Sequence, residues 1–211
     1  MPSTNELWNS DSEQDWLMAL QRYWSFVKPT HMKIEKEFDS NNVEEIAKLD
    51  ADKWYEFLRE KYFFWKYTAP NRYKTTSNHL KKYLGLGDSL QTLFLIKERI
   101  FNFDKENIFV GLTTACEIRG LGTAGASGLL SVLFPFHFAT VDQFVVKALL
   151  EVEGLPEKSA LSKMNPEQLK ITDGVILIKI LKQKAKELNH EFKSNNWSAR
   201  KIDMVLWVSS R

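Results

Sequence analysis

The sequence predicts an all-α fold, because apolar residues recur at helical spacing along most of the chain, strand-like alternation is almost absent and no internal repeat is visible. The 211 residues are 44% hydrophobic and 27% charged, which is typical of a globular protein and excludes wholesale disorder. A chain of this length can enclose a sizeable apolar core. We therefore expect one compact helical unit.

Apolar stripes place the helices of the first half of the chain. Trp16, Leu20 and Trp24 fall at helical spacing after Ser12, a residue type that caps helices. Pro29 follows this stretch as a stop. The same pattern predicts helices over residues 12–27, 43–49, 53–67, 77–84 and 89–100.

The second half continues in the same way. Only residues 136–141 have any strand character, and they lie between helices. Residues 65–68 and 71–73 mix aromatic and basic side chains in an expected loop. The predicted helices cover residues 107–117, 123–134, 142–151, 166–189 and 198–208.

Charge is distributed unevenly along the chain. Residues 1–52 carry 5 basic and 11 acidic residues, a net charge of −6, whereas residues 53–105 carry +6 and residues 106–211 carry +2. We expect residues 1–52 to form an acidic helical extension that packs on a core of residues 53–211. A chain whose overall charge is only +2 can still present a basic face to a polyanion. Solvated helix faces would explain the same charges.

Cysteine content and hydropathy indicate the cellular compartment in which the protein is expected to work. The single cysteine, Cys116, excludes an internal disulfide and a multi-cysteine zinc cluster, and it indicates a reducing environment. The N-terminus is polar and acidic, unlike a secretory signal. Pro135 and Lys147 interrupt the most apolar stretch, residues 128–150, whereas a bilayer span needs about 20 apolar residues in a row. We expect a cytoplasmic protein without a membrane partner.

A glycine-rich turn between two apolar helices is the most informative segment. Gly120 and Gly122 flank Leu121, which can anchor the turn in the core. The two glycines permit positive φ and close backbone approach. Thr123 is expected to cap the next helix, whose free first-turn amides suit a phosphate oxygen. Small residues then let the two helices approach each other closely: Ala124, Gly125, Ala126 and Gly128. A tight turn without a ligand would explain the same pattern.

An acidic residue opens an apolar helix about twenty residues after Gly122. Asp142 follows Val141 and precedes Gln143 and Phe144. Taken alone, an Asp at a helix start is commonly an N-cap worth about 1 kcal/mol.

The hairpin, the spacing and the Val-Asp pair together resemble the helix-hairpin-helix superfamily of DNA glycosylases, over roughly residues 53–150. A narrower likeness is to bacterial proteins grouped with the 8-oxoguanine DNA glycosylases, whose C-terminal part carries a Trp-x-x-Arg-Lys-Ile-Asp-Met element like residues 197–204 of this chain. The resemblance implies base-excision repair of double-stranded DNA. It also implies release of a modified base, in the narrower case an oxidised purine, by a protein that we expect to be a monomer.

The resemblance also implies roles for individual residues. Asp142 would be the catalytic carboxylate, which stabilises the positive charge that develops on the sugar. Gln143 and Phe144 would face the flipped base. Other residues suited to the base pocket or to DNA contact are Lys66, Tyr67, Arg72, Trp197 and Arg200. The DNA backbone would be held by Arg119, Gly120, Leu121, Gly122, Thr123 and Ala124, in this superfamily often with a monovalent cation.

No other cofactor is expected. The four histidines are scattered without metal-ligand spacing, and no cysteine set could hold an iron–sulfur cluster. Arg200 and Asp203, three residues apart on one helix, are expected to pair with each other.

One position departs from the superfamily pattern. Members that also cut the strand carry a lysine two residues after the second hairpin glycine, where this chain has Ala124. Lys147 lies on another side of the helix that Asp142 begins, so it is a poor substitute. The resemblance therefore implies either a monofunctional glycosylase, with water as the nucleophile, or lost activity. The alternatives are a non-catalytic hairpin module for lesion recognition or defence, and an all-α interaction protein without a nucleic-acid role.

Overall fold

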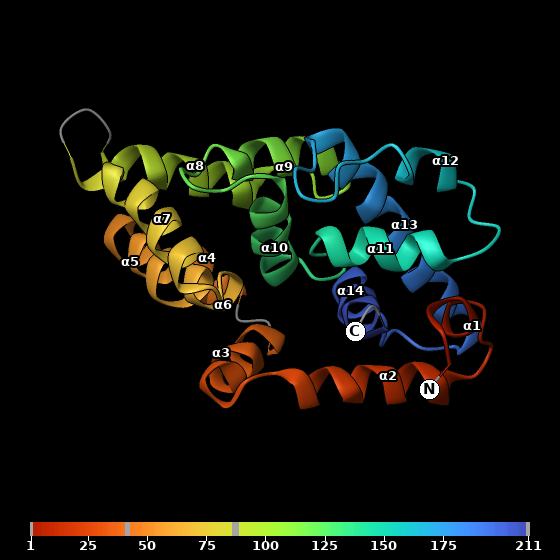
Figure 1. Ribbon diagram of the computed structural model, residues 1–211. Helices are drawn as coiled ribbons and strands as arrows, with labels where there is room; N and C mark the ends of the chain where they lie inside the picture. Colours follow the sequence, from red (N-terminus) through yellow and green to blue (C-terminus); the bar gives the residue numbers. More distant parts are fainter. Residues whose placement is uncertain (1, 41–42, 86–88, 210–211) are drawn as a thin grey trace.

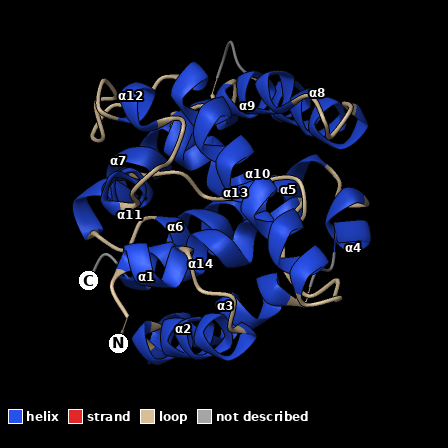
Figure 2. Cartoon of the chain, turned by 90° about the vertical axis from the view of Figure 1, so that its right-hand side faces the viewer, coloured by secondary structure: helices blue, strands red, loops and turns tan. Residues whose placement is uncertain are grey.

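The computed structural model describes residues 2–40, 43–85 and 89–209, and these form helices joined by loops (Figure 1). Helix accounts for 71% of the chain, and the described residues contain no strand (Figure 2). The prediction of an all-α fold is therefore confirmed. Within the described ranges, no helix combines the length and the apolar character that crossing a bilayer requires.

Most of the helices are α-helices, whereas η1 is a π-helix and η2 is a 3₁₀-helix. In chain order the helices are α1 (Thr4–Trp8), α2 (Glu13–Phe26), α3 (Pro29–Asp39), α4 (Val43–Ala47), α5 (Ala51–Glu56), η1 (Phe57–Phe63), α6 (Phe64–Lys66), α7 (Pro70–Leu80), η2 (Lys81–Leu84), α8 (Leu90–Asn102), α9 (Ile108–Cys116), α10 (Thr123–Leu133), α11 (Gln143–Glu151), α12 (Lys158–Leu161), α13 (Ile171–Glu191) and α14 (Ala199–Ser209).

Helix α10 stands in the middle of the molecule (Figure 1). It packs against α9, the preceding helix of the hairpin, and also contacts α13 and α14. Helix α14 in turn packs against α2, α11 and α13. Ten of the eleven residues of α10 are buried, so this helix has no charged, solvent-facing side, and its two serines are also buried.

The N-terminal segment lies on the surface formed by α11, α13 and α14. Trp16 of α2 is fully buried, and its ring meets that of Trp197 edge-on at 5.7 Å between centroids. The Thr4 hydroxyl donates to the Glu151 carboxylate at 2.6 Å, and Lys184 Nζ donates to the Trp8 carbonyl oxygen at 3.0 Å. Packing of buried aromatic side chains thus attaches the N-terminal segment to residues 53–211, although the segment is acidic.

Several helix boundaries differ from those predicted. Residues 71–73, expected in a loop, belong to α7, which starts seven residues before the predicted Ser77. Pro70 at its first turn is pre-organised for a helix start, but the polar α7 gives little apolar periodicity. Ser12 stands at the N-cap of α2, yet its side chain makes no cap hydrogen bond. Helices α1, α3 and α12 were not predicted.

Residues 136–141 do not form the strand that their composition suggested. The Thr140 N–H donates to the Asp203 carboxylate at 2.7 Å, and the Val141 N–H donates to the Ser127 hydroxyl at 3.0 Å. Side chains therefore satisfy the N–H groups of Thr140 and Val141, where a neighbouring strand would otherwise do so.

The predicted helix over residues 53–67 contains a π-helical segment, η1. This segment widens the turn over Phe57–Phe63 before the chain returns to α-helix in α6. Tyr62 and Lys66, one turn apart, both lie against Gly128 of α10. Segments of π-helix are uncommon and frequently occur at functional sites.

Candidate functional site

The hairpin turn uses its two glycines differently. Gly120 has φ = +96°, the conformation that requires glycine. Gly122 has φ = −95° and ψ = −174°, which any residue adopts. Leu121 between them is buried, as predicted. Gly122, not Thr123, is the N-cap of α10, so the prediction of a threonine cap is wrong: Thr123 is already the first helical residue, and its side chain is buried.

Gly122 leaves open space at the start of α10. It is exposed, and a Cβ added there would meet no atom within 4 Å. As a glycine, the N-cap residue has no side chain with which to cap the first amides of this helix. Such an uncapped N-terminus with free approach is accessible to an incoming anion.

Helix α9 does pack against α10, as expected, but two of the small residues, Gly125 and Gly128, make room for different neighbours. A Cβ at Gly125 would lie 2.5 Å from the Tyr67 hydroxyl, and one at Gly128 would lie 2.8 Å from the Tyr62 hydroxyl. The Tyr62 hydroxyl also donates to the Gly125 carbonyl oxygen. These glycines therefore seat the side chains of residues 62–67 against α10, rather than mainly allowing α9 to approach.

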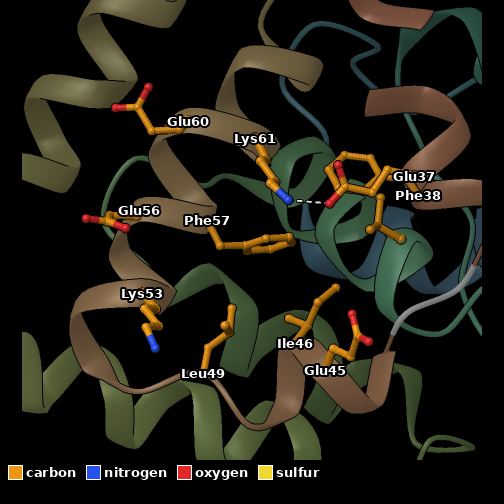
Figure 3. Close-up of a pocket in the computed structure, with 11 residues that line it drawn as sticks. Glu37, Phe38, Glu45, Ile46, Leu49, Lys53, Glu56, Phe57, Glu60 and Lys61 are labelled. Atoms are coloured by element: carbon orange, nitrogen blue, oxygen red, sulfur yellow. Dashed lines mark hydrogen bonds and ion pairs between the residues drawn. The ribbon is translucent and has the colours of Figure 1, made fainter. Parts of the chain in front are cut away.

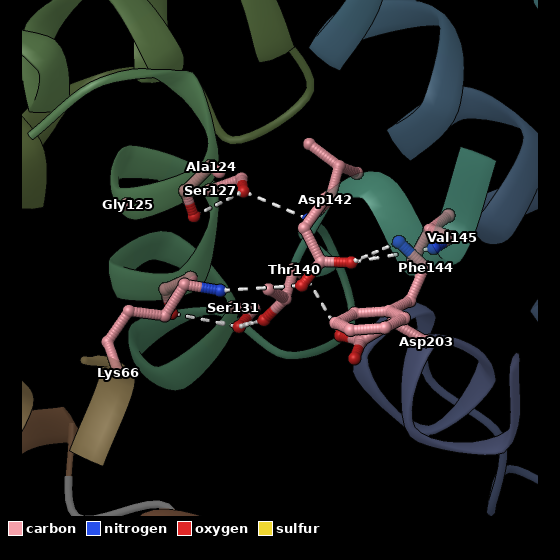
Figure 4. A network of polar contacts seen from close by, with 12 residues as sticks. Lys66, Ala124, Gly125, Ser127, Ser131, Thr140, Asp142, Phe144, Val145 and Asp203 are labelled. Carbon is pink, nitrogen blue, oxygen red and sulfur yellow. Dashed lines mark hydrogen bonds and ion pairs between the residues drawn. The ribbon is translucent and has the colours of Figure 1, made fainter. Parts of the chain in front are cut away.

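Helix α10 also fixes the segment that leads into Asp142 (Figure 4). Ser127 accepts from the Val141 N–H at 3.0 Å, and the Ser131 and Thr140 hydroxyls lie 3.1 Å apart. All of these groups are buried. The second helix of the hairpin thus holds residues 140–141 by side-chain hydrogen bonds, and Asp142 begins α11 directly after them.

Asp142 divides its two carboxylate oxygens between two tasks. Oδ1 accepts from the Phe144 N–H at 3.0 Å and from the Val145 N–H at 3.4 Å, so it caps α11. Oδ2 lies 3.9 Å from Lys66 Nζ, which reaches it from α6 (Figure 4). The Asp142 side chain is 25% exposed and that of Lys66 is 13% exposed. Oδ1 therefore has a structural role as a helix cap. Oδ2 lies near the Lys66 amine, where the Asp142 side chain is partly exposed.

Several charges converge on the Lys66 amine. Burial is the largest effect and lowers the pKa of Lys66, and the Arg200 guanidinium lowers this pKa as well. The nearby carboxylates of Asp142, Asp203 and Glu35 act in the opposite direction and raise it. The net direction is downward. A buried lysine with a lowered pKa has a larger fraction of neutral amine than a surface lysine.

Arg200 and Asp203 do not form the pair that their spacing suggested. Arg200 Nη2 donates to Glu35 Oε1 at 2.7 Å, and both side chains are almost fully buried. The guanidinium also lies 5.2 Å from the centre of the Trp65 ring. Asp203 accepts instead from the Thr140 N–H. Glu35 could not be found from sequence, because nothing in its surroundings distinguishes it from the other acidic residues of segment 1–52.

Asp203 has an unusual pKa. Burial raises it to about 7, although Arg200, the Thr140 N–H and Lys66 all act to lower it. An aspartate in the unfolded chain has its ordinary pKa of about 4. Near neutral pH the folded protein therefore holds a proton on Asp203 that the unfolded chain does not.

This difference predicts a pH dependence of stability. Because the folded state binds the extra proton between the two pKa values, the free energy of unfolding should fall by about 2 kcal/mol from pH 5.5 to pH 8.5 through this group. Asp203→Asn keeps an oxygen for the Thr140 N–H and removes the titration. Urea unfolding across this pH range should show a flatter profile for the variant; parallel profiles would contradict the assignment.

Two residues predicted to contact DNA lie in the core. Trp197 is 1% exposed and Arg200 is 3% exposed, so neither offers its side chain to a surface ligand. Trp197 packs on Trp16, and Arg200 is held by Glu35. Their predicted DNA contacts therefore disagree with the structure. The Trp-x-x-Arg-Lys-Ile-Asp-Met element is instead part of the internal packing.

The other predicted contact residues lie nearer the surface. Gln143 and Phe144, directly after Asp142, are half-buried, and the Phe144 ring lies 6.4 Å from that of Trp207. Arg72 is exposed on α7. Tyr67 is half-buried with its hydroxyl against Gly125 of α10, and burial raises its pKa to about 12.

A basic surface adjoins the hairpin. Residues 61–87 contain no Asp or Glu. Helix α7 lies beside the turn, since a Cβ at Gly120 would meet Thr76 at 2.9 Å and His79 at 3.3 Å. The exposed cations of α7, η2 and the turn are Arg72, Lys74, Lys81, Lys82 and Arg119.

Two cavities lie away from this region. One of about 440 Å³ is walled by Phe38, Ile46 and Phe57, with an ion pair between Glu37 and Lys61 at its rim (Figure 3). The other, of about 650 Å³, lies between α13 and residues 152–157. Neither is lined by Asp142, Lys66 or a hairpin residue. In the described part of the chain, no three His, Cys, Asp or Glu residues are grouped as metal ligands.

Comparison with known proteins identifies no relative. No family model matches the chain, and no curated protein and no solved structure is significantly similar to it. The likeness to the glycosylase superfamily therefore depends on the motifs within residues 118–146 and 197–204.

Proposed function

We propose that this protein is a DNA N-glycosylase that releases a modified base in base-excision repair. The observation that carries the proposal is the geometry of Asp142. One oxygen caps α11, while the other is left for a partner in a partly exposed position beside an amine. A carboxylate that served only as a helix cap would need no buried cation at its second oxygen.

The chemistry would use this second oxygen, Oδ2, which does not cap the helix. Breaking the N-glycosidic bond leaves positive charge on the sugar, and a fixed carboxylate stabilises that charge. Asp142 is held rigidly for this role, because α11 binds its Oδ1 and α10 binds the preceding backbone through Ser127. The target nucleotide would have to leave the duplex stack to reach it.

The hairpin and its basic surroundings support DNA as the substrate. The open start of α10 at Gly122 suits a phosphate, and the exposed cations of α7 and the turn lie beside it. Double-stranded DNA would bind here without sequence preference and with strong salt dependence. Oxidised purines are the substrate class that the likeness of residues 197–204 favours.

A second candidate is a DNA-binding module without catalysis. Ala124 favours it, because the hairpin lacks the lysine that strand-cutting members carry. Both candidates predict salt-dependent DNA binding, and only the first predicts base release.

Asp142→Asn should abolish base release while leaving the protein folded. Asparagine caps helices as well as aspartate does, and the lost ion pair with Lys66 is long and partly exposed. The melting temperature should therefore stay close to that of the parent. The rate should fall at least about a hundredfold, because the amide carries no charge to stabilise the sugar cation. The measurement is base release from duplexes carrying 8-oxoguanine, uracil, hypoxanthine or an alkylated purine, developed with hot alkali.

The controls separate the candidates. Retention on DNA that weakens with salt, without release of any base, would favour the non-catalytic module. An active Asp142→Asn variant would contradict the assignment of Asp142. A chain that does not bind DNA would contradict both candidates.

A further inference from the structure

Lys66 brings a primary amine to Asp142 from a distant part of the sequence. Its side chain crosses α10 at Gly128, where Lys66 Cδ and Cε lie 3.3 and 3.4 Å from the place that a Cβ would occupy. The absence of a side chain at Gly128 therefore opens the path by which Nζ reaches a point 3.9 Å from Asp142 Oδ2 (Figure 4).

We propose that Lys66 is a catalytic residue that forms an imine with the abasic sugar left after base release, so that the protein also cuts the strand at that sugar. The proposal takes its substrate from the proposed function, which places that sugar at Asp142. Lys66 then supplies from α6 the amine that the hairpin lacks at Ala124.

The reaction balances without an oxidant or a further reagent. The neutral amine of Lys66 adds to the C1′ aldehyde of the ring-opened sugar, and water leaves as the imine forms. A proton is then lost from C2′, with Asp142 Oδ2 as the nearby acceptor, and the C3′–O bond breaks. The 3′-side strand departs with a 5′-phosphate. Water finally hydrolyses the imine, which releases an unsaturated aldehyde and restores Lys66.

The surroundings of Lys66 suit this chemistry. An amine must lose its proton to attack, and burial lowers the pKa of Lys66. Its position is fixed by packing against α10 rather than by an exposed, mobile stem. Lys147, by contrast, is exposed on α11, so it serves as a matched control.

The test uses the whole protein and a duplex with one abasic site, which needs no base release. With borohydride present, we expect a covalent protein–DNA adduct whose peptide map places the DNA on Lys66. Lys66→Arg keeps the positive charge but is a far weaker nucleophile, so adduct and strand cutting should both fall at least about tenfold. Lys147→Arg should leave both unchanged.

An adduct on another lysine, or none, would overturn the proposal; the wild-type map decides this even if Lys66→Arg does not fold. Base release is read separately, by hot alkali on duplexes with modified bases. Release without an adduct would leave the glycosylase proposal standing and remove the role of Lys66. An adduct on Lys66 without release from any modified base would support the amine chemistry and contradict the proposed glycosylase.

Discussion

Glu35→Gln should destabilise the protein by about 3 kcal/mol, a loss expected when a buried ion pair loses one partner. Glu35 Oε1 accepts from Arg200, and Oε2 accepts from the indole N–H of Trp65. Both charged side chains are under 5% exposed. Glutamine keeps one acceptor but no charge, which leaves the guanidinium uncompensated in the core. The measurement is the free energy of unfolding in urea, and the melting temperature should fall by about 10 °C.

Glu37→Gln is the matched control for this change. Glu37 lies on the same helix and also forms an ion pair, with Lys61, but both of those side chains are about one-third or more exposed. Exposed pairs contribute up to about 1 kcal/mol. The double variant Glu35→Gln with Arg200→Met should recover most of the lost stability, because the guanidinium that Glu35 neutralised is then absent as well. Equal losses for Glu35→Gln and Glu37→Gln would contradict this account.

Gly120→Ala should also cost about 3 kcal/mol of stability. Its φ of +96° strains any residue with a Cβ. The added methyl group would also lie 2.9 Å from Thr76 Cγ2 and 3.0 Å from the Thr76 carbonyl oxygen, and overpacking of this kind costs about 1–3 kcal/mol. Because a backbone atom of α7 is involved, the neighbour cannot simply turn away. Thermal and urea unfolding measure the effect.

Gly122→Ala tests the other half of the turn. The added methyl group would meet no atom within 4 Å, and residue 122 has an ordinary φ. The free energy of unfolding should therefore fall only because alanine is a poorer helix cap, by about 0.5–1 kcal/mol. If a phosphate approaches this backbone, the methyl group should nevertheless weaken DNA retention. If Gly120→Ala lowered the free energy of unfolding no more than Gly122→Ala does, the argument from backbone strain would be wrong.

The sequence contained enough to predict the fold class and the centre of the candidate site. Helical periodicity found α8, α9, α10, α11 and α14, each of which buries several apolar residues. It also found α2, although that helix buries only Trp16 and Ala19. It missed the start of α7, whose residues are mostly polar, and it could not reveal η1, because a π-helical turn leaves no mark in the apolar pattern. Asp142 is the N-cap of α11, at the helix start that the apolar pattern predicted.

The contacts that Lys66, Glu35 and Arg200 make in the structure could not be predicted from the sequence. Lys66 was predicted to contact DNA, but its approach to Asp142 depends on the path that Gly128 opens across α10. Glu35 was one of eleven acidic residues in an extension expected to remain outside the core. The Arg200–Asp203 pair was predicted from spacing alone. In the structure the buried Arg200 guanidinium pairs instead with the buried carboxylate of Glu35 on α3.

The pairing of Glu35 with Arg200 has a consequence for the order in which the protein is made. The two residues are 165 positions apart, so a ribosome releases the carboxylate long before it synthesises its guanidinium. Until α14 emerges, the nascent chain must keep Glu35 hydrated, and the apolar faces of α2 and α3 cannot settle into their final places. Domains generally fold as units once their sequence is complete. The interior around Glu35 can close only when α14 has left the exit tunnel.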